Sequence, residues 1–211
     1  LQKDGSFLEP FNPRQGENFE PVPGFHEGSA WNYTFYVPHD IMGLAKLMGG
    51  RKAFVSRLQK VFDEGLYDPA NEPDIAYAYL FSYFKGEEWR TQKTVHELLE
   101  KYYTTRPNGL PGNDDTGTMS AWAIFSMMGF YPDCPGKAEY TLTTPRFDSI
   151  EIRLAPEYCE GENKLVIKCS RTSGEGWKKI GSVKLSGKTL PSLRVSHKDL
   201  VKGGLLEFRC L

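Results

Sequence analysis

Two adjacent carboxylates, Asp114 and Asp115, stand in a turn-rich segment directly ahead of an apolar run. The segment reads Gly112-Asn113-Asp114-Asp115-Thr116-Gly117, and the run that follows extends from Ala121 to Phe130. Side-chain oxygens at the start of a helix accept hydrogen bonds from its first backbone N–H groups, so a helix cap is the plainest interpretation. Paired carboxylates also suit hydrolysis, in which one group acts as acid and the other as base.

Two further acidic clusters stand at predicted helix starts, His26-Glu27 and Asn71-Glu72. Apolar residues recur at helical spacing in five segments with short connections, which favours antiparallel neighbours. Pro38 interrupts the first segment and Asp40 restarts it. The segments cover residues 29–48, 51–64, 73–85, 88–103 and 117–129. Because the first, third and fifth would run the same way, we expect the three acidic clusters to meet at one end of the helical region.

A group of carboxylates repels itself unless one is protonated or a cation is bound. The clusters offer Glu, Asp and Asn oxygens without a cluster of Cys and His, which favours a hard cation, calcium or magnesium. Helix N-termini also attract negative charge, so each cluster taken alone has the alternative interpretation of an ordinary cap. Trp31, close in sequence to Glu27, has two interpretations as well: a core residue or a platform for a sugar ring.

The composition allows a packed core and gives no sign of a nucleic-acid or membrane partner. Of the 211 residues, 39% are hydrophobic, and the formal net charge is −1. A chain of this charge lacks the basic surface that nucleic acids and anionic membranes attract. No apolar run reaches the roughly 18 residues of a membrane-spanning helix.

The residue pattern changes after Pro132. Short segments that alternate polar and apolar residues follow Pro135-Gly136, as expected for β-strands. These predicted strands cover residues 140–142, 150–154, 164–167, 181–185 and 205–208. We therefore predict a helical region over residues 1–135 and a β region over residues 136–211.

The four cysteines, Cys134, Cys159, Cys169 and Cys210, form no C-x-x-C pair and no zinc-like spacing with His. Cys159 and Cys169 flank a turn-rich segment, and they either bridge in an oxidising compartment or stay reduced. Asn32-Tyr33-Thr34 is an N-glycosylation sequon, but it lies in a predicted helix, so we expect it to be unused.

Several blocks of the sequence together resemble glycoside hydrolase family 92, the calcium-dependent exo-α-mannosidases. They occur in one order between about residues 10 and 155, and several are specific enough to make chance similarity a poor explanation. The blocks are Phe25-His26-Glu27-Gly28-Ser29-Ala30-Trp31-Asn32-Tyr33-Thr34, Val37-Pro38-His39-Asp40, Leu47-Met48-Gly49-Gly50, Ala70-Asn71-Glu72-Pro73, Thr91-Gln92, Gly112-Asn113-Asp114-Asp115-Thr116-Gly117, Met119-Ser120-Ala121-Trp122 and Gly129-Phe130-Tyr131-Pro132.

The resemblance implies an α+β multidomain fold, with the last helices of an (α/α)6 toroid followed by a β-sandwich portion. It also implies removal of terminal α-linked mannose with inversion, through an oxocarbenium-like transition state. Glu27 matches the general acid and Asp115 the general base, with Asp114 as supporting carboxylate or alternative base. Because an inverting pair stands roughly 6.5–9.5 Å apart, we predict that separation for the Glu27 and Asp115 carboxyl groups.

The resemblance further implies a calcium ion that holds the mannose hydroxyls and helps to distort the ring. The residues that match its ligands are Asn71, Glu72 and Asp115. A second set, His26, Trp31 and Asn113, flanks the carboxylates, and we assign it to substrate binding.

Members of this family are far longer than this chain, which begins at Leu1 rather than Met. We therefore expect part of a longer enzyme, whose missing N-terminal half closes the other side of the pocket around a mannose-containing glycan. Such enzymes are usually exported, so we expect a secreted, periplasmic or cell-surface location. The competing interpretation is a non-catalytic carbohydrate-binding or structural fragment.

Overall fold

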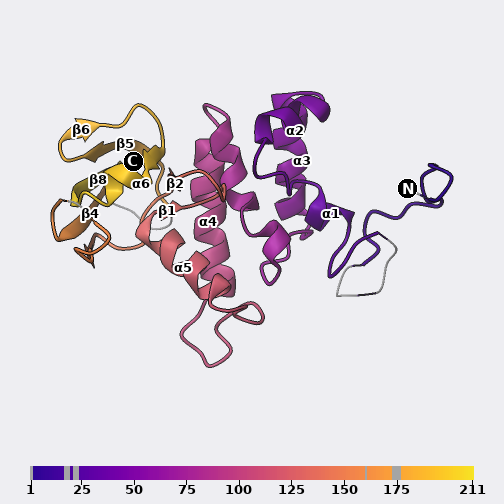
Figure 1. The fold of residues 1–211 in the computed structure, drawn as a ribbon, viewed down its shortest axis with the longest axis horizontal. Helices are drawn as coiled ribbons and strands as arrows, with labels where there is room; N and C mark the ends of the chain where they lie inside the picture. The colour runs from indigo at the N-terminus through magenta and orange to yellow at the C-terminus, as the bar shows by residue number, and fades with distance from the viewer. Residues whose placement is uncertain (1, 17–19, 21–23, 160, 173–176) are drawn as a thin grey trace.

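The computed structural model describes residues 2–16, 20, 24–159, 161–172 and 177–211, which divide into a helical part and a β-rich part. Figure 1 shows the first helices on the N-terminal side, the strands on the opposite side, and α4 and α5 between them. The helices are α1 (Ala30–Tyr33), α2 (Ile41–Leu47), α3 (Arg51–Asp63), η2 (Glu72–Asp74), η3 (Tyr77–Tyr83), α4 (Glu88–Tyr102), α5 (Thr118–Met128) and α6 (His197–Leu200). The strands are β1 (Phe130–Tyr131), β2 (Glu139–Leu142), β3 (Ser149–Arg153), β4 (Lys164–Arg171), β5 (Ile180–Leu185), β6 (Lys188–Thr189), β7 (Arg194–Ser196) and β8 (Gly204–Cys210). Helices followed by two sheets confirm the predicted α+β class.

Helices α3 and α4 lie within one residue of their predicted bounds. The first predicted segment is two short helices, α1 and α2, separated around Pro38 as expected. Asp40 caps α2, because its side chain accepts a hydrogen bond from the Gly43 N–H at 2.8 Å.

The predicted α-helix over residues 73–85 is wrong in type, since the chain forms two 3₁₀ helices there, η2 and η3. Five consecutive side chains from Tyr77 to Phe81 are buried, so this segment is enclosed on all sides rather than along one α-helical stripe. The Tyr77 hydroxyl donates to the Asn32 backbone oxygen at 2.6 Å. Tertiary contacts on every side therefore decide the local geometry here, against the periodicity of the sequence.

Three apolar clusters among the described residues hold the elements together. One packs α2, α3 and η3 around Phe35, Phe54 and Leu58. A second joins η3, α4 and α5, with Tyr79 and Trp122 among its buried residues. The third lies among the strands. Segment η3 contributes to both helical clusters, so it is the central element of the helical part.

The described residues of the β-rich part form two sheets. The smaller has the strand order β1-β2-β7 and the larger the order β3-β4-β8-β5-β6. Strands β4 and β8 are parallel, whereas the other pairs are antiparallel. The five predicted strands are all present, but β1, β6 and β7 are too short to show an alternating pattern in the sequence. Strand β1 lies ahead of residue 136 and pairs with β2, and the domain boundary at that residue stays a prediction.

Helix α4 is tied to the larger sheet by a buried polar contact. The Gln92 side-chain oxygen accepts a hydrogen bond from the Ile180 N–H at 2.8 Å, and Gln92 is fully enclosed. This bond satisfies a buried backbone donor on β5 and fixes the helix against the strand. Among the described residues, no helix has the length and apolar character needed to cross a membrane.

Candidate active site

The loop that carries Glu27 lies against the segment that carries Asn71. The Asn71 Nδ2 donates a hydrogen bond to the Glu27 backbone oxygen across 44 residues of sequence. Asn71 is buried, whereas the Glu27 side chain is 57% exposed. A buried amide thus anchors the backbone of a loop whose carboxylate faces solvent.

The segment that carries Glu72 meets the loop that carries Asp115 through Thr118. The Thr118 hydroxyl donates to the Asp115 backbone oxygen at 2.6 Å and lies 3.5 Å from Glu72 Oε1. A Cβ atom at Gly112 would stand 2.7 Å from the Ala70 Cβ, so the two backbones pass too closely for a larger residue. Together with the Asn71 contact, these interactions confirm that the three acidic segments meet.

Both loops hold backbone conformations that are unusual for residues with a side chain. Glu27 has a φ of 54°, and Asp115 and Thr116 have φ values of 45° and 60°. Ser186, in the turn between β5 and β6, is the other described non-glycine residue with positive φ. Such strain persists where the surroundings over-determine the geometry, and it gathers at functional sites.

A buried carboxyl group, Asp74, lies beneath two of the segments. Its Oδ2 accepts hydrogen bonds from the Asn32 amide at 2.9 Å and from the Asp68 N–H at 3.0 Å. Asn32 in turn accepts from the backbone N–H and hydroxyl of Ser29, two residues after Glu27. Burial raises the Asp74 pKa to about 8, although its two hydrogen-bond donors oppose that shift. Asp74 therefore links the Glu27 loop to the Glu72 segment.

Asp114 has the capping role that the sequence suggested. Its Oδ1 accepts from the Ser120 N–H at 2.8 Å, which is a free donor in the first turn of α5. The residue at the N-cap position itself is Gly117, which has no side chain to contribute. Asp114 is thus occupied by the helix start, whereas the neighbouring Asp115 is exposed.

The residues assigned to substrate binding lie in different settings. His26 is exposed, and its Nε2 stands 3.5 Å from Glu27 Oε1. Asn113 is exposed on the loop ahead of Asp114. Trp31 is half-buried, packs against the first apolar cluster, and carries the Lys60 ammonium 5.3 Å from its ring centre. His26 and Asn113 therefore stay beside the carboxylates, while Trp31 faces α3.

Sequence reasoning missed three residues that hold the site together: Thr118, Tyr33 and Asp74. The Tyr33 hydroxyl donates to the His26 backbone oxygen, and burial, with Glu27 and Asp74 nearby, raises its pKa. Tyr33 lies inside a block that was singled out, and Thr118 directly follows one. Asp74 follows Pro73 in the first turn of a predicted helix, where an acidic residue is ordinary, so no sequence signal distinguishes it.

A cavity of about 290 Å³ opens beside Glu72 and Thr118. Aromatic and other apolar side chains line much of it, among them Tyr36, Ile75 and Tyr131. Small-molecule sites typically start near 300 Å³ and combine apolar walls with a few polar groups, so this cavity is at the lower limit for such a site.

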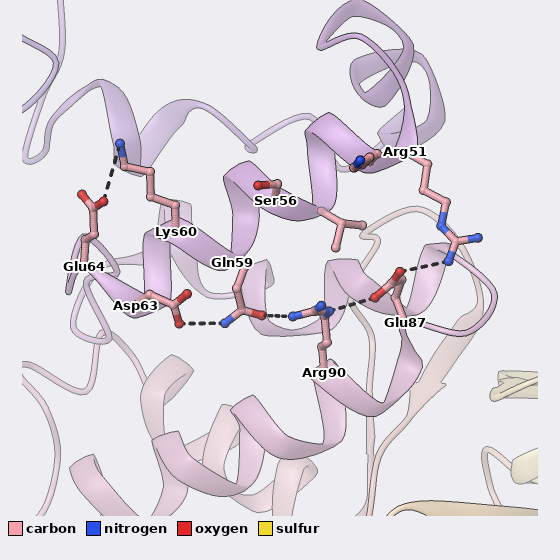
Figure 2. Close-up of a pocket in the computed structure, with 10 residues that line it drawn as sticks. Arg51, Ser56, Gln59, Lys60, Asp63, Glu64, Glu87 and Arg90 are labelled. Carbon is pink, nitrogen blue, oxygen red and sulfur yellow. Dashed lines mark hydrogen bonds and ion pairs between the residues drawn. The ribbon is translucent and has the colours of Figure 1, made fainter.

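A larger hollow of about 710 Å³ lies between α3 and the start of α4, as Figure 2 shows. Its charged side chains pair with one another: Glu87 binds Arg51 at 3.0 Å and Arg90 at 2.8 Å, and Arg90 also donates to Gln59 at 2.6 Å. None of the predicted site residues lines it. We therefore place the candidate active site at the three meeting loops and not in this groove.

The predicted calcium ligands are of the chemical type that calcium binds, but they are too few to form a complete metal site. Among the described residues, no group of three His, Cys, Asp or Glu side chains is arranged to hold a metal ion. Asn71, Glu72 and Asp115 offer one amide and two carboxylates, all of them oxygen donors of the type calcium prefers. Because calcium takes about six to eight oxygens, most of its ligands would have to come from elsewhere.

Comparisons with known proteins show the family of this chain. Residues 1–210 match the glycosyl hydrolase family 92 catalytic domain. An uncharacterized secreted glycosidase of Arthroderma benhamiae is 31% identical over 182 residues, which are 86% of this chain and 23% of that protein.

Two solved structures from Bacteroides thetaiotaomicron are similar over nearly the whole chain. One is a family GH92 α-mannosidase in complex with mannoimidazole, with a TM-score of 0.86 and 27% identity, covering 99% of this chain and 29% of that one. The other is a family GH92 inverting mannosidase, with a TM-score of 0.81 and 28% identity, covering 98% of this chain and 30% of that one. The chain thus spans less than a third of the length of these relatives. The chain belongs to glycosyl hydrolase family 92.

Proposed function

We propose that this chain supplies the acid and base loops of an exo-acting α-mannosidase, which removes terminal α-linked mannose with inversion. The observation that carries the proposal is the meeting of the Glu27, Asn71-Glu72 and Asp115 segments in a chain of this family. The strained backbone at Glu27 and Asp115 supports it, because strain of this kind gathers at functional sites. The two α-mannosidase relatives support the substrate class.

In this proposal Glu27 donates a proton to the departing glycosidic oxygen, and Asp115 removes a proton from the attacking water. Both side chains are exposed on their loops, so substrate and water can approach them. Asp114 assists from the same loop while it caps α5, and His26 and Asn113 contact the sugar beside the carboxylates. Trp31 would contact the sugar from the side of the Glu27 loop that faces α3.

Calcium is part of the proposal, with Asn71, Glu72 and Asp115 as the ligands from this chain. When bound, it would hold mannose hydroxyls and favour a distorted ring. The Thr118 contacts support this ligand assignment, because they keep the Glu72 segment next to the Asp115 loop. Water, substrate hydroxyls and other parts of the protein would complete the coordination.

We propose further that the chain is the C-terminal portion of a longer enzyme, with residues 1–135 completing an (α/α)6 toroid and residues 136–211 belonging to a β-sandwich. The coverage of 23% to 30% of the relatives supports the view that the enzyme is longer than this chain. In it, the N-terminal half of the same enzyme would close the pocket around a mannose-containing glycan. The relative described as a secreted glycosidase supports an exported location.

The proposal is tested by mannose release from α-1,2-, α-1,3-, α-1,4- and α-1,6-mannobioses, followed by proton NMR. The sample should be the full-length protein that carries this chain, with calcium, after EDTA treatment, and after calcium is restored. We expect β-mannose as the first product, loss of release with EDTA, and recovery with calcium.

Three other outcomes would change the proposal. If α-mannose appears first, the reaction retains configuration, and the roles given to Glu27 and Asp115 are wrong. If release is unchanged by EDTA, the calcium assignment fails while the carboxylate roles stand. If the mannobioses bind without being cleaved, the alternative of a non-catalytic carbohydrate-binding module replaces the enzyme.

A further inference from the structure

The cysteines of the β-rich part are placed differently from the pairing that the sequence suggested. Cys169 lies on β4 and Cys210 on β8, and their sulfur atoms are 3.5 Å apart. Cys159 stands outside the strands and is half-exposed. The close pair is therefore formed by two cysteines 41 residues apart, not by Cys159 and Cys169.

The strand register explains why the two thiols meet. Strands β4 and β8 run parallel, with Cys169 opposite Phe208 and Arg171 opposite Cys210. Positions two residues apart on a strand point to the same face, so Cys210 and Cys169 project on one side of the sheet as diagonal neighbours. Both side chains are buried, at 5% and 1% exposure, within the third apolar cluster.

We propose that Cys169 and Cys210 form a disulfide when the protein folds in an oxidising environment. The sulfurs already touch, and closing from 3.5 Å to the roughly 2 Å of a disulfide requires about 1.5 Å of movement. The backbone around Cys210 is paired on both sides, so rotation of the two side chains would supply that movement.

The chemistry balances with glutathione disulfide as the oxidant. The Cys169 thiolate attacks one glutathione sulfur, which breaks the S–S bond, releases one glutathione and leaves a mixed disulfide on Cys169. The Cys210 thiolate then attacks the Cys169 sulfur and releases the second glutathione. The two thiol protons pass to the two glutathione molecules, so the protein loses two hydrogen atoms. Both thiols are buried in the folded sheet, so this exchange takes place during folding, before β8 is fully packed.

The position of β8 shows what the bond would do. This strand is the centre of the five-stranded sheet, because β4 pairs with one of its edges and β5 with the other. If β8 detached from its end, the sheet would separate into two parts. A bond from Cys210 to β4 pins that end and reduces the conformational freedom of the unfolded chain.

The test is peptide mapping of the protein that carries this chain, folded with reduced and oxidised glutathione, with free thiols alkylated under denaturing conditions before digestion. We expect a peptide pair joining Cys169 and Cys210, two hydrogen atoms lighter than its parts and separated by reduction. We also expect alkylated Cys134 and Cys159. Full alkylation of Cys169 and Cys210, or a peptide joining Cys159 to Cys169, would overturn the proposal.

A stability measurement gives an independent readout. We expect protein folded with reductant to melt roughly 2–5 °C below the oxidised protein. The Cys159→Ser variant should keep this difference, and the double variant Cys169→Ala with Cys210→Ala should lose it. An equal difference in the double variant would show that another cysteine pair is responsible. If the double variant does not fold, the peptide map of the unaltered protein still decides.

Discussion

The loops that carry Glu27 and Asp115 and the strands around Phe208 are held in place by different forces. The loops are fixed by hydrogen bonds from Asn71 and Thr118, while their own carboxylates remain exposed. Strand β8 is fixed by its ladders to β4 and β5 and by side chains that alternate toward a dry apolar cluster. Because the reactive groups of a site must stay accessible, burial of those groups cannot be what holds its loops in place.

Under the proposed function, this contrast separates the residues that act from the residues that stabilise the fold. Substitutions at exposed loop carboxylates should change activity with little effect on folding. Substitutions at buried positions of β8 should change folding through packing alone. Asp74 combines both features, because it is buried like the core residues and also holds the site loops through its hydrogen bond with Asn32.

The largest effect is expected on the reaction rate of the full-length enzyme. Glu27→Gln and Asp115→Asn each keep the shape of the side chain but remove its ability to transfer a proton. We expect kcat/KM for mannobiose cleavage to fall by roughly 10²- to 10⁴-fold in each variant, as is typical for acid and base groups. The melting temperature should stay unchanged, because both side chains are exposed.

Glu157→Gln is the matched control, since Glu157 is an exposed acid between β3 and β4 and is not one of the predicted site residues. Its activity and melting temperature should equal those of the unaltered enzyme. Full activity in both loop variants would show that these carboxylates are ordinary surface groups. The loops and the strands would then differ in how they are held in place but not in function.

The next effect concerns the strands. Phe208 is buried at 2% exposure in the apolar cluster, whereas its neighbour Arg209 is exposed. We expect Phe208→Ala to lower the free energy of unfolding by roughly 3–5 kcal/mol, because it removes a large buried side chain and leaves a cavity. Arg209→Ala on the same strand should stay within about 0.5 kcal/mol.

Urea unfolding followed by circular dichroism measures both variants under the same conditions. Equal losses for the two positions would contradict the one-sided burial of β8. An activity loss in Phe208→Ala at temperatures where the variant is fully folded would show that the strands and the site loops are coupled.

The elements that the sequence predicted well are those with a simple period. Helices α3 and α4 have apolar stripes, and β4 alternates buried and exposed residues. The spacing of apolar residues along the chain was therefore enough to predict them. Segment η3 was assigned the wrong helix type because its order comes from two apolar clusters at once. Strands of two or three residues, such as β6 and β7, are defined by their partners and have no period of their own.

The candidate site was predictable to the extent that it depended on residue types and on the direction of the helices. That reasoning brought Glu27, Asn71-Glu72 and Asp115 together. It could not give Thr118, whose hydroxyl joins two of those segments by contacts that depend on the tertiary arrangement. Nor could it pair Cys169 with Cys210, because that contact depends on the register of two strands far apart in sequence.

The last effect depends on pH and concerns Asp74. Its pKa is raised from 3.8 to about 8 by burial, so between those values the folded protein holds a proton that the unfolded chain has released. The stability contributed by the neutral group is complete below about pH 4 and is lost as the pH rises through 8. In that window the free energy of unfolding should fall by about 1.4 kcal/mol per pH unit through this group.

Asp74→Asn isolates this contribution. An asparagine oxygen can accept from Asn32 and Asp68, and its NH₂ group replaces the carboxyl oxygen, Oδ1, that has no hydrogen-bond partner. The variant cannot ionise, so its stability relative to the unaltered protein should increase steadily from pH 5 to pH 8 in urea titrations. Parallel curves would mean that Asp74 is ionised in the folded protein. In that case Asp74 would be a buried carboxylate stabilised by its two hydrogen-bond donors. The loops would then be held by a charged hydrogen-bond network and not by a neutral one.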